Sequence, residues 1–386
     1  MPSTAKKQPS AWSAACFLKP MLTVGVLMLA ASNATAQGTH GFDHEGLPKQ
    51  VLEQHIRPLY ADLADKADKL RLTLTAACQS RGADDGNAIR TAFRDLVLAW
   101  SRTEHLRFGP ITDRNRFERV MYWPDRQRIG ERQVSQILSK KEPAATAAVE
   151  LGKRSVAVQG LTALEIVLYG PGGSTILSET AEARFACRYA TAIATGIDTI
   201  AKEIASEWAD GASFTTLWLE PGEQNPVYKA SGDRTIEILK GYRFGIYNAR
   251  DMKLLPSLGL KRIALRGQLA PKSRPPFELS GQSLASMIAN LEGVLDLYVK
   301  GGLAEQLAAR ESEAARLTKL SLESAIEAMR AIEPSGQAAF NDQAIMDRLA
   351  SVRDPLSFAL SEGGLALAEI AGMGALVLGF LDDDGD

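Results

Sequence analysis

The chain has 386 residues, of which 45% are hydrophobic and 23% are charged, and its formal net charge at pH 7 is −2. A chain of this length can bury a large core and typically folds into two domains or two lobes. The near-neutral charge excludes the basic footprint of a nucleic-acid-binding protein, so we expect no nucleic-acid partner.

The first 36 residues have the pattern of a secretory signal peptide. Three lysines precede an apolar run at residues 21–31, and Ala34-Thr35-Ala36 supplies the small-x-small cleavage pattern. The apolar run is too short to span a bilayer comfortably, although a retained signal anchor is the alternative. Cys16 precedes the run, where no lipid-attachment site is expected. We therefore predict cleavage near Ala36 and export to the periplasm of a bacterium with two membranes. Cleavage removes three lysines and so lowers the formal charge of the chain from −2 to −5.

The mature chain has no predicted transmembrane span. The most apolar later stretch, Leu365 to Phe380, is short and contains Glu369 and three glycines. A spanning helix needs roughly 20 predominantly apolar residues.

Helical spacing of apolar residues dominates the first half of the mature chain. Pro58 is expected to kink the first helix, Gly109-Pro110 to end the second, and residues 111–130 to be irregular. The helices are expected over residues 47–78, 87–106, 131–139, 143–153, 155–169 and 178–208.

The best domain boundary is residues 215–225, where Pro221-Gly222 and the nearby Asn225-Pro226 interrupt the pattern. Beyond it, residues 259–276 are basic and proline-containing, as expected of a loop. Helices are expected over residues 228–255, 279–298, 303–332, 337–351 and 355–378. We therefore predict an all-α fold of two helical-bundle lobes packed against each other, with one lobe in residues 37–214 and the other in residues 226–386.

Two cysteines, Cys78 and Cys187, remain after signal cleavage, in a compartment that allows disulfides. A bond between them would close a loop of about 110 residues and stabilise the fold by roughly 4 to 5 kcal/mol in the chain-entropy estimate. Two separate buried thiols are the alternative. Neither cysteine has a histidine at a spacing typical of a catalytic nucleophile.

The run Gly160-Leu-Thr162-Ala-Leu-Glu165 resembles half of a helical metal site. Positions i and i+3 share a helix face, so Thr162 and Glu165 should project together. A histidine at position 162 would complete a His-x-x-Glu pair, whereas threonine is a poor ligand for zinc or iron. Glu165 would then need partners from elsewhere in the chain.

Polar residues near two helix breakers are further candidates. Trp100, Glu104 and Arg107 should share a helix face at i, i+4 and i+7, and Asp125 lies in the following irregular segment. Near the mature N-terminus, residues 40–45 combine two histidines and two acids, for which adventitious metal binding at a disordered end is the favoured interpretation. Ser280 is expected to cap the helix that follows it.

Several segments resemble the imelysin-like family of bacterial envelope proteins over about residues 47–386. The markers are, in chain order, His55-Ile-Arg-Pro-Leu-Tyr60, Glu104-His-Leu-Arg107-Phe-Gly-Pro110, Trp123-Pro124-Asp125, Gly160-Leu-Thr-Ala-Leu-Glu165, Ser280-Gly-Gln-Ser-Leu284, and Gly379-Phe380 followed by Asp384-Gly385-Asp386. The resemblance implies one imelysin-like domain of two helical lobes, with a site at or near their interface. The family's Gly-x-His-x-x-Glu motif has Thr162 in place of its histidine here, which weakens the expectation of peptidase activity.

Three functional hypotheses follow from the resemblance and the residues. The first is a non-enzymatic periplasmic binding or accessory protein in metal acquisition, with iron or another divalent or trivalent metal as cofactor or cargo, and with other envelope proteins as partners. Its ligand-binding residues would be Glu104, Arg107, Asp125, Thr162 and Glu165, of which the three carboxylates could ligate a metal. The second is a metallopeptidase-like hydrolase in which His55 or His105 replaces the missing ligand. The third is a metal-free ligand-binding or protein-binding scaffold in which Arg107 pairs with Glu165.

Overall fold

Helices, long and short, make up most of the described structure, as the spacing of apolar residues predicts. The computed structural model describes residues 41–373 apart from 83, 126, 261–263, 266–267, 270–273 and 334–338, so the predicted signal peptide and the acidic C-terminal residues lie outside it. The helices before the predicted boundary are α1 (Gly46–Val51), α2 (Arg57–Ser80), α3 (Asp85–Thr103), α4 (Arg116–Val120), α5 (Ile129–Lys140), α6 (Ala148–Gly152), α7 (Gly160–Tyr169) and α8 (Ala181–Glu207). Those from the boundary onward are α9 (Ser213–Leu219), α10 (Ser231–Tyr247), α11 (Leu255–Ser257), α12 (Ser283–Val299), α13 (Leu303–Ala308), α14 (Ser312–Arg330), α15 (Gln343–Ala350), α16 (Arg353–Phe358) and α17 (Gly364–Ile370).

Shorter elements join these helices. The described part of the expected loop at residues 259–276 contains two short strands, β1 (Ala264–Leu265) and β2 (Gln268–Leu269), which pair antiparallel with Ala264 opposite Leu269. Short 3-10 segments cover Gly109–Asn115, which is kinked at Asp113 and Arg114, and Pro143–Thr146, Val156–Val158 and Gly173–Thr175. Turns of π-helix cover Leu52–Ile56, Asn248–Leu254 and Ala359–Gly363.

The first predicted helix is continuous through a widened turn. A π-helical turn, Leu52–Ile56, joins α1 to α2, and Pro58 follows it in the first turn of α2. Proline has no backbone N–H, so it is tolerated where the regular hydrogen-bond ladder is already interrupted. Arg81 ends the helix in a left-handed conformation, with φ of 53°.

Four sequence predictions of secondary structure were wrong in detail. The segment expected to be irregular contains α4, and the helix expected at 303–332 is broken between α13 and α14. The helices expected at 143–153 and 155–169 are broken at Ala147 and Gln159. Ala147 has an extended conformation, with φ of −115° and ψ of 116°, so the chain leaves the helix for one residue. Apolar spacing continues across such breaks because both halves pack on the same core, which is why periodicity does not reveal them.

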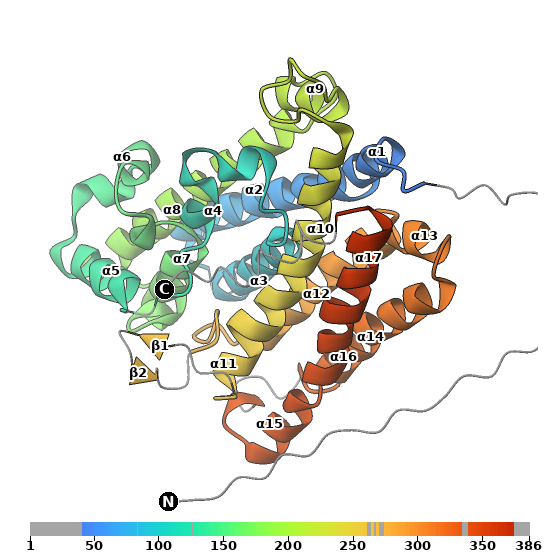
Figure 1. Cartoon of the computed structure of the whole chain (residues 1–386). Helices are drawn as coiled ribbons and strands as arrows, with labels where there is room; N and C mark the ends of the chain where they lie inside the picture. The colour runs from blue at the N-terminus through green and yellow to red at the C-terminus, as the bar shows by residue number, and fades with distance from the viewer. Residues whose placement is uncertain are drawn as a thin grey trace, which may run out of the picture. The chain divides into compact units, whose positions relative to one another are not determined.

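Helices α2, α3, α7 and α8 form one packed group. Helix α2 packs against both α3 and α8, and α7 packs against α8 (Figure 1). The contact face of α2 consists of buried residues at three-and-four spacing: Tyr60, Leu63, Ala67, Leu70, Leu74 and Ala77. This packing supports α7, the helix that carries Thr162 and Glu165.

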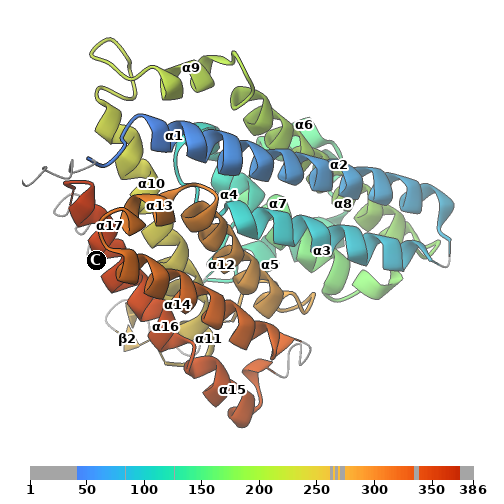
Figure 2. The same ribbon diagram turned by 90° about the vertical axis from the view of Figure 1, so that its right-hand side faces the viewer.

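Helices from the C-terminal half form a second group around α12. Helix α12 packs on α10, α13 and α14, and α14 packs on α16 (Figure 2). Helix α12 also packs against α3, so α3 contacts both groups. Buried polar residues on α3 and α12 can therefore meet. The predicted division of the chain at residues 215–225 stays a prediction.

A disulfide joins α2 to α8. Cys78 and Cys187 are bonded across a sequence separation of 109 residues, with 5.8 Å between their Cα atoms. Of the two alternatives that the sequence leaves open, the structure shows the bonded one.

In the part of the chain that the structure describes, no helix is both long enough and apolar enough to cross a membrane.

Candidate functional site

The glycine of the Gly-x-Thr-x-x-Glu motif is required by a close backbone approach. Gly160 begins α7 with φ of 71°, and a Cβ atom there would collide with the carbonyl oxygens of Arg119 and Val120. Glycine adopts a positive φ readily, and it has no Cβ atom to collide with the neighbouring backbone. Gly160 thus lets the start of α7 pack closely against the end of α4, which fixes the position of the residues that follow it.

Glu165 lies in the interior and is held by one serine. Its Oε1 atom accepts hydrogen bonds from the backbone N–H of Ser280 at 2.8 Å and from the Ser280 hydroxyl at 2.7 Å. The residue is only 6% exposed, and burial raises its pKa to about 7 even though the Ser280 bonds oppose that rise. Glu165 can therefore exchange a proton near neutral pH.

Ser280 does not cap the following helix, contrary to the sequence prediction. The N-cap residue of α12 is Gln282, which makes no side-chain cap bond, and the Ser280 hydroxyl points to Glu165. Leaving the buried carboxyl of Glu165 without a hydrogen bond would cost more free energy than leaving the amides of a helix end to water. The Ser280 hydroxyl therefore bonds to the carboxyl. This contact spans 115 residues of sequence, so local patterns do not reveal it.

Thr162 lies one helical turn before Glu165, as predicted. The side chain is partly buried, and its hydroxyl is buried with no hydrogen-bond partner among the described residues. A buried hydroxyl without a partner is costly unless a ligand, ion or water completes it. Thr162 is therefore the residue of the motif that has an unmet bonding requirement.

Glu104 is engaged in a buried network that the sequence analysis missed. Helix α3 ends at Thr103, so Glu104 follows the helix rather than sharing a face with Trp100 and Arg107. Its Oε2 atom accepts from Lys253 Nζ at 2.5 Å and from Asn290 Nδ2 at 2.6 Å, while Asn290 Oδ1 accepts from Lys253 at 2.8 Å.

Lys253 is fully buried in this network, and burial lowers its pKa despite the Glu104 carboxylate. The three residues come from the end of α3, the π-helical turn Asn248–Leu254 and α12, and they bind these elements together. The available sequence signal was a lysine in the apolar segment Met252–Leu258 and an asparagine in the apolar helix α12.

Arg107 stacks on aromatic rings instead of pairing with an acid. Its guanidinium carbon lies 3.5 Å from the ring centre of Phe117 and 5.2 Å from that of Phe244. Among the described residues no ion pair joins Arg107 to Glu165, so the pairing expected for a metal-free scaffold is not formed. The cation–π contacts hold the guanidinium in place.

Asp125 serves as a structural cap. Its two carboxylate oxygens accept from the backbone N–H groups of Ile129 and Gly130, each at 2.7 Å. These are the first amides of α5, which have no partner within the helix. Asp125 therefore stabilises the start of α5.

His55 and His105 bind each other. Their Nε2 atoms lie 2.8 Å apart, and His55 Nδ1 lies 3.4 Å from Asp296 Oδ2. Both imidazoles are buried, and burial lowers both pKa values, that of His105 to well below 6.5. The histidines neither point to solvent nor bond to Glu165.

The residues expected to hold a metal do not gather. Glu104, Asp125 and Glu165 each bind donors of their own, and no group of three His, Cys, Asp or Glu side chains within the described ranges is placed to hold a metal ion. A zinc or iron site needs three or more such ligands around one point. The donor set present does not fit a metal centre built on these three carboxylates.

The described part of the acidic and histidine-rich N-terminal segment is an anchor rather than a disordered end. Asp43 accepts from the backbone N–H of Gly46 at 2.7 Å, and His44 Nδ1 lies 3.0 Å from the Thr235 hydroxyl. Glu45 pairs with the buried Arg234 at 3.0 Å. His44 and Glu45 therefore attach the segment to α10, while Asp43 stabilises the start of α1.

Comparison with known proteins gives one family and solved structures of similar fold. The sequence profile described as imelysin matches residues 56–356. An imelysin-like protein from Psychrobacter arcticum 273-4 has a crystal structure that superposes with a TM-score of 0.69 at 21% identity, covering 86% of this chain and 96% of that one. A protein described as an iron-regulated protein A precursor, from Parabacteroides distasonis ATCC 8503, superposes with a TM-score of 0.67 at 13% identity, covering 85% and 94%. No curated protein matches the chain.

Proposed function

The chain belongs to the imelysin family, and from this premise we propose that it is an exported binding or accessory protein of the bacterial cell envelope that serves iron acquisition and does not hydrolyse peptides. Two observations support the export and iron parts. Residues 1–36 have the composition of a cleaved signal peptide, and a protein of similar fold is described as iron-regulated.

The observation that carries the non-hydrolytic part is the state of the motif carboxyl. Glu165 is buried and bonded to Ser280, and Thr162 stands where the motif would supply an imidazole. A hydrolytic metal centre needs three protein ligands and an open position for water. His55 and His105, which could have replaced the missing ligand, are bonded to each other.

The proposed binding face is the side of α7 that carries Thr162 and Glu165. The Thr162 hydroxyl lacks a hydrogen-bond partner among the described residues, so a ligand can supply that bond. Because Glu165 changes charge near pH 7, ligand binding on this face can change its protonation state. Iron is cargo in this proposal. It would arrive in a complex or be passed by a partner protein, because the carboxylates do not form a site for the bare ion.

The first test is growth under iron limitation. A deletion strain should grow poorly when iron is chelated, and ferric salt or the wild-type gene should restore growth, whereas Glu165→Gln should restore it only in part. The exposed-residue variant Glu313→Gln is the matched control and should complement fully. A deletion strain whose growth does not depend on iron would overturn the iron role.

The second test separates binding from hydrolysis. Purified residues 37–386 are incubated with Fe²⁺, Fe³⁺, Zn²⁺ or Cu²⁺, desalted, and assayed for retained metal and for cleavage of an unfolded protein. We expect no cleavage. Cleavage that disappears in Glu165→Gln, together with about one retained metal per chain, would favour a metallopeptidase instead.

A further inference from the structure

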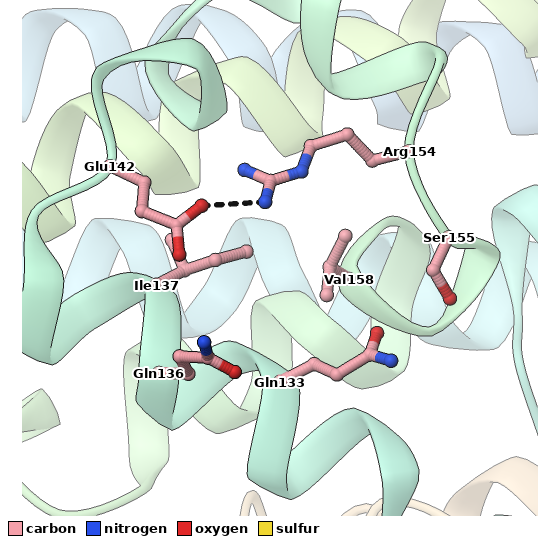
Figure 3. Close-up of a pocket in the computed structure, with 7 residues that line it drawn as sticks. All are labelled: Gln133, Gln136, Ile137, Glu142, Arg154, Ser155 and Val158. Atoms are coloured by element: carbon pink, nitrogen blue, oxygen red, sulfur yellow. Dashed lines mark hydrogen bonds and ion pairs between the residues drawn. The ribbon is translucent and has the colours of Figure 1, made fainter.

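A pocket of about 330 Å³ lies between α5 and the segment that leads into α7, away from the residues described above. Figure 3 shows Glu142 and Arg154 facing each other on one side of it and two glutamines on the other. Ile137 and Val158 lie between the two polar sides. The volume is at the lower end of the range for ligand pockets, so the ligand it fits is small.

Buried hydrogen bonds hold the frame of this pocket. Gln159 donates from Nε2 to the carbonyl oxygen of Arg154 at 2.8 Å and to that of Ser155 at 3.4 Å. The Tyr189 hydroxyl donates to the carbonyl oxygen of Val158 at 2.8 Å. Because Gln159 and Tyr189 are buried, the backbone that presents Arg154 is fixed before any ligand arrives.

The polar groups of the pocket have bonding capacity left over. Arg154 Nη2 donates to Glu142 Oε2 at 2.6 Å, and within the described residues this is the one side-chain bond of either partner. A guanidinium has five N–H donors and a carboxylate has two oxygens, so both groups can bind a ligand without separating. The side-chain amides of Gln133 and Gln136 have no hydrogen-bond partner among the described residues. Each amide can both donate and accept a hydrogen bond to a ligand.

We propose that this pocket binds a small zwitterion of the α-amino-acid type. The ligand carboxylate takes the free edge of the Arg154 guanidinium, in the paired geometry that arginine favours for carboxylates. The ligand ammonium group takes the free oxygen of Glu142, and the ligand side chain lies over Ile137 and Val158 within reach of the glutamines.

The lining residues disfavour two other ligand classes. Among the described residues, the pocket lining includes no aromatic ring on which a sugar could stack. The single positive charge of Arg154 is balanced by Glu142, so the pocket does not favour a phosphate or another multiply charged anion. A ligand with one positive and one negative group matches both charges. This site is separate from Glu165 and does not depend on the iron-related proposal.

The test is calorimetric titration of residues 37–386 with free amino acids, including aliphatic and polar side chains. For the tightest binder, the deaminated acid and the decarboxylated amine of the same skeleton are titrated in parallel. We expect saturable binding of the amino acid and at least about tenfold weaker binding of each analogue. Equal binding of either analogue, or no amino acid binding up to about 10 mM, would overturn the proposal.

Variants assign the binding to this pocket. Glu142→Gln and Arg154→Gln should each weaken binding by at least about tenfold, because each removes one charge partner of the ligand. Arg128→Gln with Glu131→Gln is the matched control, since it removes an ion pair at the start of α5, outside the pocket. Gln136→Ala, at an exposed helix position, is a third and milder pocket variant that keeps the Glu142–Arg154 ion pair. Binding that survives all three pocket variants would place the ligand elsewhere.

Discussion

The imidazoles of His55 and His105 lie in the buried interior with 2.8 Å between their Nε2 atoms, and Asp296 lies beside the far nitrogen of His55. A contact of this length needs a donor N–H on one ring and a lone pair on the other. Two doubly protonated rings cannot form it. The pair therefore depends on at least one imidazole staying neutral.

The histidine pair should make the protein less stable in mild acid. Both pKa values are lowered from 6.5 by burial, so the folded state takes up fewer protons than the unfolded state as the pH falls below about 6.5. The stability is present above that pH and is lost progressively below it. Urea unfolding between pH 8 and pH 5 measures this slope.

His105→Gln keeps a hydrogen-bonding side chain without a titrating ring and should flatten the slope. His44→Gln is the comparison variant: burial lowers the pKa of that imidazole too, but the ring is less buried and bonds to Thr235, so the slope should change less than in His105→Gln. An unchanged slope in His105→Gln would show that the pair does not govern acid stability.

Glu165→Gln should stabilise the protein in mild alkali and change little in acid. The folded pKa of about 7 lies above the unfolded value of 4.5, so the favourable contribution of the neutral carboxyl is complete below pH 4.5 and lost as the pH rises through 7. Glutamine stays neutral and can still accept from Ser280. We expect a gain of up to about 3 kcal/mol near pH 8.5.

Denaturant unfolding at pH 4.5 and pH 8.5 tests this prediction, with Glu305→Gln as the exposed-carboxylate control. A loss of stability in Glu165→Gln at pH 8.5 would mean that the ionised carboxylate is the favoured form.

Lys253→Met should destabilise the fold by roughly 3 to 5 kcal/mol, because it leaves Glu104 buried without its cation. Adding Glu104→Gln should recover part of that loss, since no buried charge then remains. Lys153→Met, which removes the exposed partner of Glu150, should cost about 1 kcal/mol or less. Additive losses in a double-mutant cycle of Lys253 and Glu104 would contradict a coupled pair.

Removing the disulfide should cost about 2 to 5 kcal/mol, because it closes a long loop between α2 and α8. The measurement is urea unfolding of residues 37–386 in oxidised form, in reduced form and as the double variant Cys78→Ser with Cys187→Ser. The reduced protein and the variant should agree. Equal midpoints for the oxidised and reduced forms would show that the bond adds no stability.

Much of the helical framework could be predicted from local spacing, but the partners of the site residues could not. Thr162 and Glu165 lie one turn apart on α7 as expected. Ser280, by contrast, was expected to cap a helix, and the cluster of Glu104 and Arg107 was expected to share one helix face. The first expectation failed because Ser280 bonds to Glu165, a buried acceptor far away in sequence. The second failed because α3 ends at Thr103, before Glu104 and Arg107.

The sequence by itself determined the all-helical fold class and the position of the motif helix, because burial of an apolar stripe imposes a spacing that can be read along the chain. It also placed the cysteines where a disulfide was possible. Only the tertiary structure decided that Cys78 meets Cys187, that His55 meets His105, and that the three candidate carboxylates stay apart. Such contacts depend on how the helices pack against each other, and packing brings together residues whose separation in sequence carries no periodic signal.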